Sequence, residues 1–203
     1  MPLRNRVHAD GRIVADPARG LFTGNRGILH VADGVMGPAL WRHRAWIVCT
    51  LDWQGRRRPV MTGRRWTALF FLDEAVALAA GHRPCAYCRR EAHARWRDAW
   101  AAAHGPARAP EMDARLHAAR AVPGARGMRH WRIPDPRDLP DGTAIRVDGR
   151  AGLIHRSRLW PVRMDGYDPP EPLPARPVEV LTPRPTVEVL GQGYRPVLHP
   201  DLT

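Results

Sequence analysis

Two cysteines three positions apart are the residues of this chain whose types and spacing point most clearly to chemistry. Cys85 and Cys88 form a C-x-x-C motif, in which two thiolates on a tight turn can bind one Zn²⁺ ion through Zn–S bonds of about 2.3 Å. Pro84 stiffens the chain just before this turn, and Gly81 is expected to end the helix that precedes it. The spacing therefore predicts one half of a metal site.

A structural zinc site needs four ligands, so two more must come from elsewhere in the chain. Cys49 is the natural third ligand, because it is the one remaining cysteine. Its side chain falls on the apolar face of a predicted strand over Ala45–Trp53, so the alternative is a small buried hydrophobic residue. If Cys49 does bind metal, its strand must pack beside the C-x-x-C turn. The fourth ligand is expected to be one of four histidines: His30, His43, His82 or His93.

Two other interpretations of the C-x-x-C pair remain open. The two cysteines could simply be reduced and unligated in a turn. A thioredoxin-like redox pair fits less well, because no βαβ unit is evident and the motif follows a helix instead of opening one after a strand.

From Phe70 to Arg89 the sequence resembles the zinc-binding domain of the adaptive-response DNA repair protein Ada. The resemblance lies in the second cysteine pair of that family, which has a similar context, E-A-x-x-A-G-[aromatic]-R-P-C-x-x-C-x-P. The corresponding residues here read E-A-V-A-L-A-A-G-H-R-P-C-A-Y-C. It implies a zinc knuckle that acts on nucleic acid, DNA in preference to RNA, with damage recognition or repair as the role. His30 follows a strand-like R-G-I-L-H segment, as the first ligands do in such relatives, so the resemblance places it first among the histidines.

That family also supplies another cysteine pair upstream, including the thiolate that accepts a methyl group. Here Cys49 is the only cysteine upstream of the motif. We therefore do not expect self-methylating phosphotriester repair.

The charge of the chain is unevenly distributed. All 32 basic residues are arginine, and the formal net charge is +12. Residues 1–130 hold 22 arginines against 10 acidic residues, a net charge of +12, whereas residues 131–203 hold 10 of each. A positive charge concentrated in one part favours a polyanionic partner through the release of counterions from phosphates. The alternative is a solvated arginine-rich surface that reflects a GC-rich bacterial genome.

Arginines and tryptophans beside the cysteine motif are the predicted nucleic-acid contacts. Guanidinium groups bind phosphates in a bidentate manner and stack on bases, and indole rings stack on unpaired bases. Most tryptophans at such positions are core residues, which is the competing interpretation. The predicted contacts are Arg57, Arg64, Arg65, Trp66, Arg83, Arg89 and Arg90.

Several enzyme classes are excluded or disfavoured. The chain has no lysine, so a Walker A nucleotide site, a Schiff-base lysine and a PD-(D/E)xK nuclease are excluded. An HNH nuclease is disfavoured by the lack of an Asp-His pair, and a deaminase by the lack of H-x-E. A glycosylase or lyase stays open, because removal of Met1 would expose the secondary amine of Pro2. A nucleic-acid-modifying enzyme and a zinc-stapled protein-interaction module are thus the alternatives to a DNA-associated zinc protein.

The sequence contains no apolar run near 18 residues, and its three cysteines suit metal binding in a reducing compartment better than disulfides. We expect a soluble bacterial cytoplasmic protein, associated with the nucleoid if it binds DNA.

The predicted elements give an α+β fold with two domains. Residues 1–130 form a basic, zinc-stabilised α+β domain, with loops and short strands around Gly27–Val31 at its start. Its further elements are the strand 45–53 turning at Gln54-Gly55 into Arg58–Met61, a strand over Thr67–Leu72, and helices over Asp73–Gly81, Arg89–His104 and Glu111–Ala121.

Residues 131–203 hold 13 of the 21 prolines and are predicted to form a small β-rich domain, SH3-like or a partly open barrel. The expected strands cover Thr143–Val147, Arg150–His155, Val178–Leu181 and Thr186–Leu190.

Overall fold

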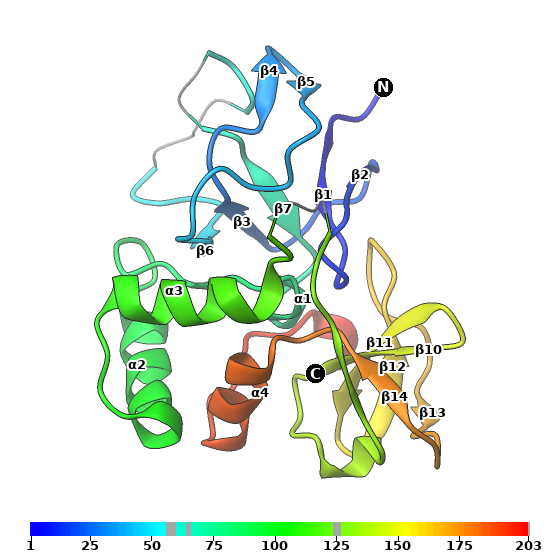
Figure 1. The fold of residues 1–203 in the computed structure, drawn as a ribbon. Helices are drawn as coiled ribbons and strands as arrows, with labels where there is room; N and C mark the ends of the chain where they lie inside the picture. The colour runs from blue at the N-terminus through cyan, green and yellow to red at the C-terminus, as the bar shows by residue number, and fades with distance from the viewer. Residues whose placement is uncertain (56–59, 64–65, 124–126, 203) are drawn as a thin grey trace.

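The computed structural model describes residues 1–55, 60–63, 66–123 and 127–202. It is a mixed α+β protein, as the sequence predicts. The helices of the described residues are α1 (Glu74–Ala79), α2 (Arg90–His104), α3 (Ala109–Arg120) and α4 (Arg184–Gly191). Figure 1 shows α1 at the centre of the molecule, with one sheet on either side of it.

The first sheet is assembled from segments that lie far apart in the sequence. Its six strands run in the order β2-β1-β7-β3-β6-β8, with β1 beside β7 and β6 beside β8 in parallel pairs. A small separate hairpin is formed by β4 (His30–Ala32) and β5 (Val35–Met36). The strands of the sheet are β1 (Arg4–Val7), β2 (Ile13–Ala15), β3 (Phe22–Asn25), β6 (Ile47–Thr50), β7 (Leu69–Phe71) and β8 (Arg83–Pro84).

The second sheet is antiparallel and is built mostly from neighbours in sequence. Its order is β13-β12-β11-β10-β14-β9, and β10, β11 and β12 follow one another as hairpins. Within the described residues none of the sheets closes into a barrel. The strands are β9 (Trp131–Ile133), β10 (Ala144–Val147), β11 (Arg150–His155), β12 (Arg158–Pro161), β13 (Glu171–Pro172) and β14 (Val178–Val180).

Helix α1 begins and ends as its sequence predicts. The Asp73 carboxylate accepts a hydrogen bond of 2.9 Å from the backbone N–H of Val76, which satisfies one free donor of the first turn. Gly81 has φ +87°, the left-handed conformation that glycine adopts without strain, and a Cβ there would lie 2.4 Å from the Arg120 side chain. The chain can therefore turn sharply into β8 and the C-x-x-C motif.

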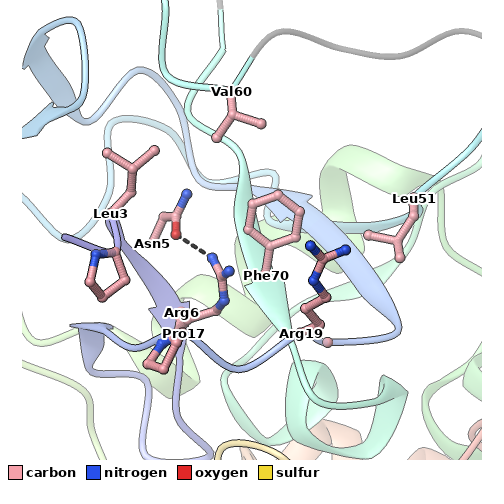
Figure 2. A pocket seen from close by; sticks show the side chains of 10 residues that line it. Leu3, Asn5, Arg6, Pro17, Arg19, Leu51, Val60 and Phe70 are labelled. Atoms are coloured by element: carbon pink, nitrogen blue, oxygen red, sulfur yellow. Dashed lines mark hydrogen bonds between the residues drawn. The ribbon is translucent and has the colours of Figure 1, made fainter.

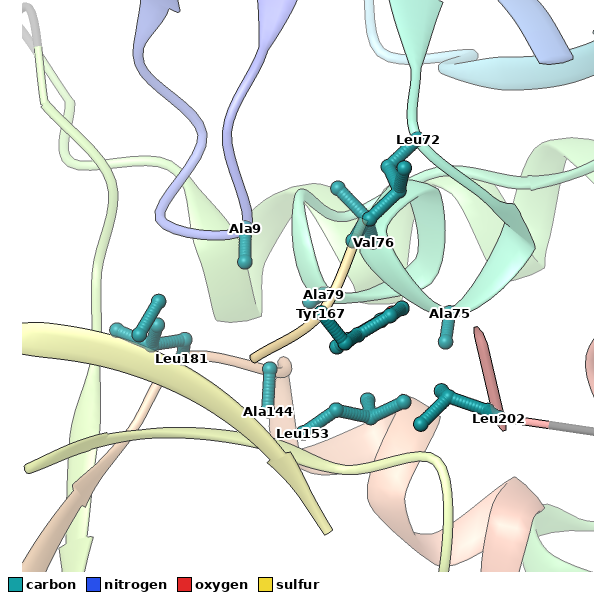
Figure 3. Packing of buried hydrophobic residues seen from close by; sticks show 11 residues of the cluster. Ala9, Leu72, Ala75, Val76, Ala79, Ala144, Leu153, Tyr167, Leu181 and Leu202 are labelled. Atoms are coloured by element: carbon teal, nitrogen blue, oxygen red, sulfur yellow. The ribbon is translucent and has the colours of Figure 1, made fainter. Parts of the chain in front are cut away.

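One apolar core joins the two halves of the chain. Leu72, Ala75 and Val76 of the first half pack with residues from the second sheet and the C-terminus, including Leu153 and Tyr167. Figure 3 shows these side chains facing one another between α1 and the second sheet. The expected division into two domains at residue 130 is not confirmed, because this core is built from both sides of that position.

A helix replaces one of the predicted strands. Thr186–Leu190 alternates β-branched and other residues, yet it forms α4, with Pro185 in its first turn, where a missing N–H leaves no hydrogen bond unmade. Val189 and Leu190 are buried against α2 and α3, together with Tyr194. Burial of one helical face therefore outweighs the strand preference of the individual residues.

The N-terminal segment is more ordered than the sequence predicts. Residues 1–44 contribute β1, β2 and β3 to the first sheet, in addition to the short hairpin β4-β5. These strands are only three or four residues long and bury polar side chains such as Asn5, Thr23 and Asn25, so they lack the apolar alternation that marks a strand.

The remaining predicted elements are found close to their expected positions. The strand 45–53 corresponds to β6, the strand 67–72 to β7, and the two long helices to α2 and α3. Gln54 and Gly55 both have positive φ, as a tight hairpin turn requires. The predicted return strand Arg58–Met61 falls partly outside the described residues, and Val60 and Met61 are not in a strand.

Candidate metal centre

Three cysteines from two separate segments meet at the end of the first sheet. In the part of the chain that the structure describes, the sulfurs of Cys49, Cys85 and Cys88 form the one cluster of metal-ligating side chains, and they lie within 4.8 Å of one another. All three residues are buried. The Cys49 strand thus packs beside the C-x-x-C turn, which is the arrangement that metal binding by Cys49 would require.

Backbone pairing explains how Cys49 reaches the other two cysteines. Strand β6 pairs in parallel with β8, so Val48 lies opposite Pro84. The backbone N–H of Cys85 then donates a hydrogen bond of 3.0 Å to the Val48 carbonyl, which extends the pairing by one residue. This fixes the start of the C-x-x-C turn directly against the strand that carries Cys49.

The turn itself is held by further backbone hydrogen bonds. The N–H of Tyr87 donates to the Cys85 sulfur at 3.4 Å, and the N–H of Arg89 donates to the Cys85 carbonyl at 3.1 Å. Cys88 stands just ahead of α2, whose first helical residue is Arg90. The positive end of the helix dipole and the N–H donor both favour the thiolate form of these cysteines.

The spacing of the three sulfurs is compatible with one metal ion. Tetrahedral zinc with Zn–S bonds of about 2.3 Å separates its sulfur ligands by about 3.8 Å, so sulfurs within 4.8 Å need only a small contraction to hold an ion. An iron–sulfur cluster places several iron and sulfide ions between its thiolates, which must then stand further apart. The residues present fit a single ion better than a cluster.

Without metal, the three thiols share protons through hydrogen bonds. The pKa of Cys49 is raised, first because its thiol hydrogen-bonds to Cys85 and Cys88 and then because it is buried. The same bonds from Cys49 and Cys88 lower the pKa of Cys85. These hydrogen bonds therefore favour the thiolate form of Cys85, which is the form that coordinates metal.

The histidines predicted as fourth ligands lie outside this cluster. The His30 ring is buried on β4, with Nδ1 2.6 Å from the Thr67 hydroxyl and Nε2 2.5 Å from the Gly63 carbonyl. His43 contacts the Asn25 side chain, and His82 is fully buried beside Arg26. His93 lies on α2, five residues after Cys88, and its Nδ1 lies 3.2 Å from the Pro84 carbonyl.

Two of the arginines predicted to bind phosphate are buried in ion pairs. The Arg83 guanidinium donates to both carboxylate oxygens of Asp113, each at 2.8 Å. Arg89 binds both oxygens of Glu74, at 2.7 and 2.8 Å. Their guanidinium groups are therefore occupied and withdrawn from the surface, and their role is to tie the C-x-x-C turn to α1 and α3.

The other predicted contacts lie in different settings. Arg90 is exposed, with no ion-pair partner in the described part of the chain. Trp66 is half-buried and packs against the cysteine cluster. Arg57, Arg64 and Arg65 lie outside the described residues.

A pocket beside the cysteines is not evident from the sequence. It has a volume of about 400 Å³ and is lined by Thr50, Trp53, Cys88, Arg89, Arg90, Glu91, Ala92 and Arg95. The buried Thr50 hydroxyl and Trp53 indole N–H have no hydrogen-bond partner among the described residues. The sequence places these lining residues directly after the cysteines, with Thr50 after Cys49 and Arg90 to Arg95 after Cys88. The two segments become neighbours only because β6 pairs with β8.

A larger pocket of about 550 Å³ lies on the far part of the same sheet, next to β1 and β7. Figure 2 shows the Arg6 and Arg19 side chains and the Phe70 ring at this pocket. The Arg6 guanidinium lies 4.8 Å from the centre of the Phe70 ring and donates a hydrogen bond to the side-chain oxygen of Asn5. The pKa of Arg6 is lowered, first by burial, with the charge of Arg19 acting in the same direction.

No helix among the described residues combines the length and apolar character needed to cross a lipid bilayer. Comparison of the whole chain with protein families, with curated proteins and with solved structures finds no match.

Proposed function

We propose that this chain is a zinc-binding protein in which Cys49, Cys85 and Cys88 hold a single Zn²⁺ ion. The observation that carries this proposal is the convergence of three buried sulfurs from two segments within 4.8 Å. Soft thiolates favour zinc over magnesium or calcium, and a compact group of single sulfurs matches one tetrahedral ion. The metal would fasten β6 to the turn before α2, so it has a structural role at the end of the first sheet.

Metal analysis of the purified protein tests this proposal. We expect one zinc per chain in the wild type and loss of the metal in both Cys49→Ser and Cys85→Ser. His43→Gln is the matched control, because His43 is exposed and lies outside the cysteine cluster. Zinc-free wild-type protein, prepared under reducing conditions with zinc in the medium, would refute the proposal.

We further propose that the zinc-stabilised fold associates with nucleic acid, DNA in preference to RNA, with damage recognition or repair as the role that the Ada resemblance favours. The supporting observation is the number of exposed arginines that have no carboxylate partner in the described residues, which is eight up to residue 130 and five after it. Those of the first half include Arg19, Arg42, Arg44, Arg90 and Arg95. In the second half, four of the nine exposed arginines form ion pairs.

The pocket of Figure 2 would take one nucleotide unit of such a ligand. Arg6 and Arg19 offer two guanidinium groups for a phosphate, and Leu3, Leu51 and Phe70 offer apolar surface for a base or sugar. Guanidinium and aromatic groups together are the combination that binds single-stranded nucleic acid.

Salt-dependent binding to a short single-stranded oligonucleotide tests this second proposal. Affinity should fall steeply with salt concentration, and Arg19→Ala should reduce the slope of log K against log salt by about 0.7 per phosphate contact removed. Arg156→Ala is the control, because Arg156 is equally exposed but lies in the neutral half. No measurable binding at low salt, with zinc bound, would leave the zinc-stapled protein-interaction module as the better interpretation.

A further inference from the structure

Among the described residues, no fourth metal-ligating side chain belongs to the cysteine cluster. The residues outside the described part are Arg, Pro, Gly, Ala and Thr, so every histidine, cysteine, aspartate and glutamate of the chain has a described position. Of these, only Cys49, Cys85 and Cys88 belong to the cluster. Zinc sites with three protein ligands are characteristically those that keep the fourth position for water or another exchangeable ligand.

The pocket beside the cluster supplies a route to that fourth position. Cys88 belongs to the cluster and also lines the pocket, and Trp53 packs against the cysteines while lining the same pocket. An ion bound to the Cys88 sulfur would stand about 2.3 Å from it, and so close to a residue that lines the pocket. The pocket is therefore the route by which we expect a small molecule to approach the ion.

The polar groups of this pocket are suited to an incoming ligand. The Thr50 hydroxyl and the Trp53 indole N–H are buried without a hydrogen-bond partner in the described residues. Buried donors are normally satisfied, so these two residues of the lining each offer a donor to a bound molecule. A ligand atom on the metal would accept these hydrogen bonds, as second-shell donors do in other zinc sites.

The charge of the pocket selects the kind of ligand. Arg90 and Arg95 lie at its rim, are exposed, and have no ion-pair partner in the part of the chain that the structure describes, while Glu91 is the one acidic residue of the lining. A zinc ion with three thiolates carries a net charge of −1, and the two arginines together with Glu91 carry +1, so the charges of the site balance. An anionic donor that approaches past the two arginines at the rim is therefore not repelled by the thiolates.

Building on the proposed zinc function, we infer that the fourth coordination position is open to a small anionic ligand that enters through this pocket. Thr50 and Trp53 would donate hydrogen bonds to the bound ligand atom, and Arg90 and Arg95 would attract its charge. The site would thus be a ligand-binding zinc centre in addition to a structural one.

Two measurements on the full-length protein test this inference separately from zinc binding itself. X-ray absorption of the zinc-loaded protein should give three sulfur neighbours and one lighter neighbour. In the Co²⁺-loaded protein, titration with azide should shift the d–d bands in a saturable way while cobalt stays bound. If no metal binds at all, the proposed function fails; if metal binds but four sulfurs are found, or azide causes no shift, only the inference is overturned.

Single substitutions test whether the ligand enters through the pocket and whether a side chain of the protein is the fourth metal ligand. Thr50→Val should keep one metal per chain but weaken azide binding. Arg95→Ala should weaken azide by about twofold to fivefold and leave binding of neutral imidazole unchanged, as expected for about 0.4 to 1 kcal/mol from an exposed charge. Glu91→Gln and His93→Gln should leave the lighter neighbour in place. Loss of that neighbour in either variant would show that the chain itself provides the fourth ligand and would overturn the inference.

Discussion

The two six-stranded sheets of this molecule differ in how they treat polar groups. In the first 130 residues, Arg26, Arg83, Arg89 and Arg120 are buried together with Asp113, Glu74 and other charged side chains. After residue 130, the buried polar residues of the described chain are only three threonines. The first sheet also joins distant segments, whereas β10, β11 and β12 are consecutive hairpins.

This difference shows where specific polar contacts decide the structure. The centre of the first region contains Trp46, with the Arg26 and Arg120 guanidiniums 4.4 and 3.9 Å from its ring. Arg26 donates to the carbonyls of Gly11 and Ala80, and Arg120 donates to the carbonyl of Gly81. Single polar residues therefore hold distant segments together there, while local pairing and apolar packing suffice in the second sheet.

The largest difference that we expect between the two regions is the loss of free energy of unfolding when a single carboxylate is replaced by its amide. Glu74 is fully buried and accepts hydrogen bonds from Arg89, Tyr194 and the backbone of Val197. Glu74→Gln leaves the Arg89 charge buried without its partner and should lower the free energy of unfolding by about 3 to 5 kcal/mol.

The matched change in the second region is Asp168→Asn, which removes a half-buried partner of the exposed Arg150 and Arg163. It should cost less than about 1 kcal/mol. Urea unfolding of both variants measures the contrast, and equal losses would abolish the proposed distinction between the regions.

Zinc removal should loosen the first region more than the second. With free zinc 100 to 1,000 times above its dissociation constant, the ion contributes about 2.7 to 4.1 kcal/mol to stability. Hydrogen exchange after chelation should therefore accelerate at β6 and β8 and stay slow in β10 and β11. Uniform acceleration across both sheets would show instead that the two regions unfold as one unit.

The contact between the two regions can be tested at Tyr167. Its hydroxyl donates to Asp73 at 2.8 Å, and the same carboxylate oxygen accepts from the backbone N–H of His199. Burial raises the pKa of Asp73, while these hydrogen bonds act to lower it. Tyr167→Phe removes one bond to a buried acidic group and should cost about 1.5 to 3 kcal/mol in thermal or urea unfolding. A cost near zero would show that Asp73 does not depend on the second half.

The smallest predicted effect is a pH dependence that arises in the first region. Burial, and then the charges of Arg26 and Arg120, lower the pKa of His82 well below 6.5. Neutral His82 accepts from Arg26 through Nε2, with Nδ1 3.2 Å from the Ala77 carbonyl. The unfolded chain binds a proton at higher pH than the folded one, so stability should fall as pH decreases below about 6.5, by at most about 1.4 kcal/mol per pH unit.

His82→Gln should reduce this slope, because an amide can donate and accept without titrating. Urea unfolding between pH 5.5 and 7.5 measures it for both proteins. An unchanged slope would assign the pH dependence to other histidines such as His43 and His93, whose pKa values are also lowered, first by desolvation.

Elements with local signals were predictable, and those with remote partners were not. The cap at Asp73, the stop at Gly81 and the hairpin strands around Asp148-Gly149 follow from neighbouring residues. The strand predicted at Thr186–Leu190 was wrong, because burial against α2 and α3 made it helical. The strands β1, β2 and β3 were not predicted, and β1 and β3 pair with β7, which lies far along the chain.

The sequence by itself determined the chemistry that is available: a C-x-x-C turn, one further cysteine, no lysine, and a positive charge confined to the first 130 residues. Tertiary structure decided how these residues are used. Parallel pairing of β6 with β8 brought Cys49 to Cys85 and Cys88, and it withdrew Arg83 and Arg89 into ion pairs with Asp113 and Glu74. The reason is physical: a thiol or guanidinium gains its role from the groups that lie within a few ångströms, and those groups come from remote parts of the sequence.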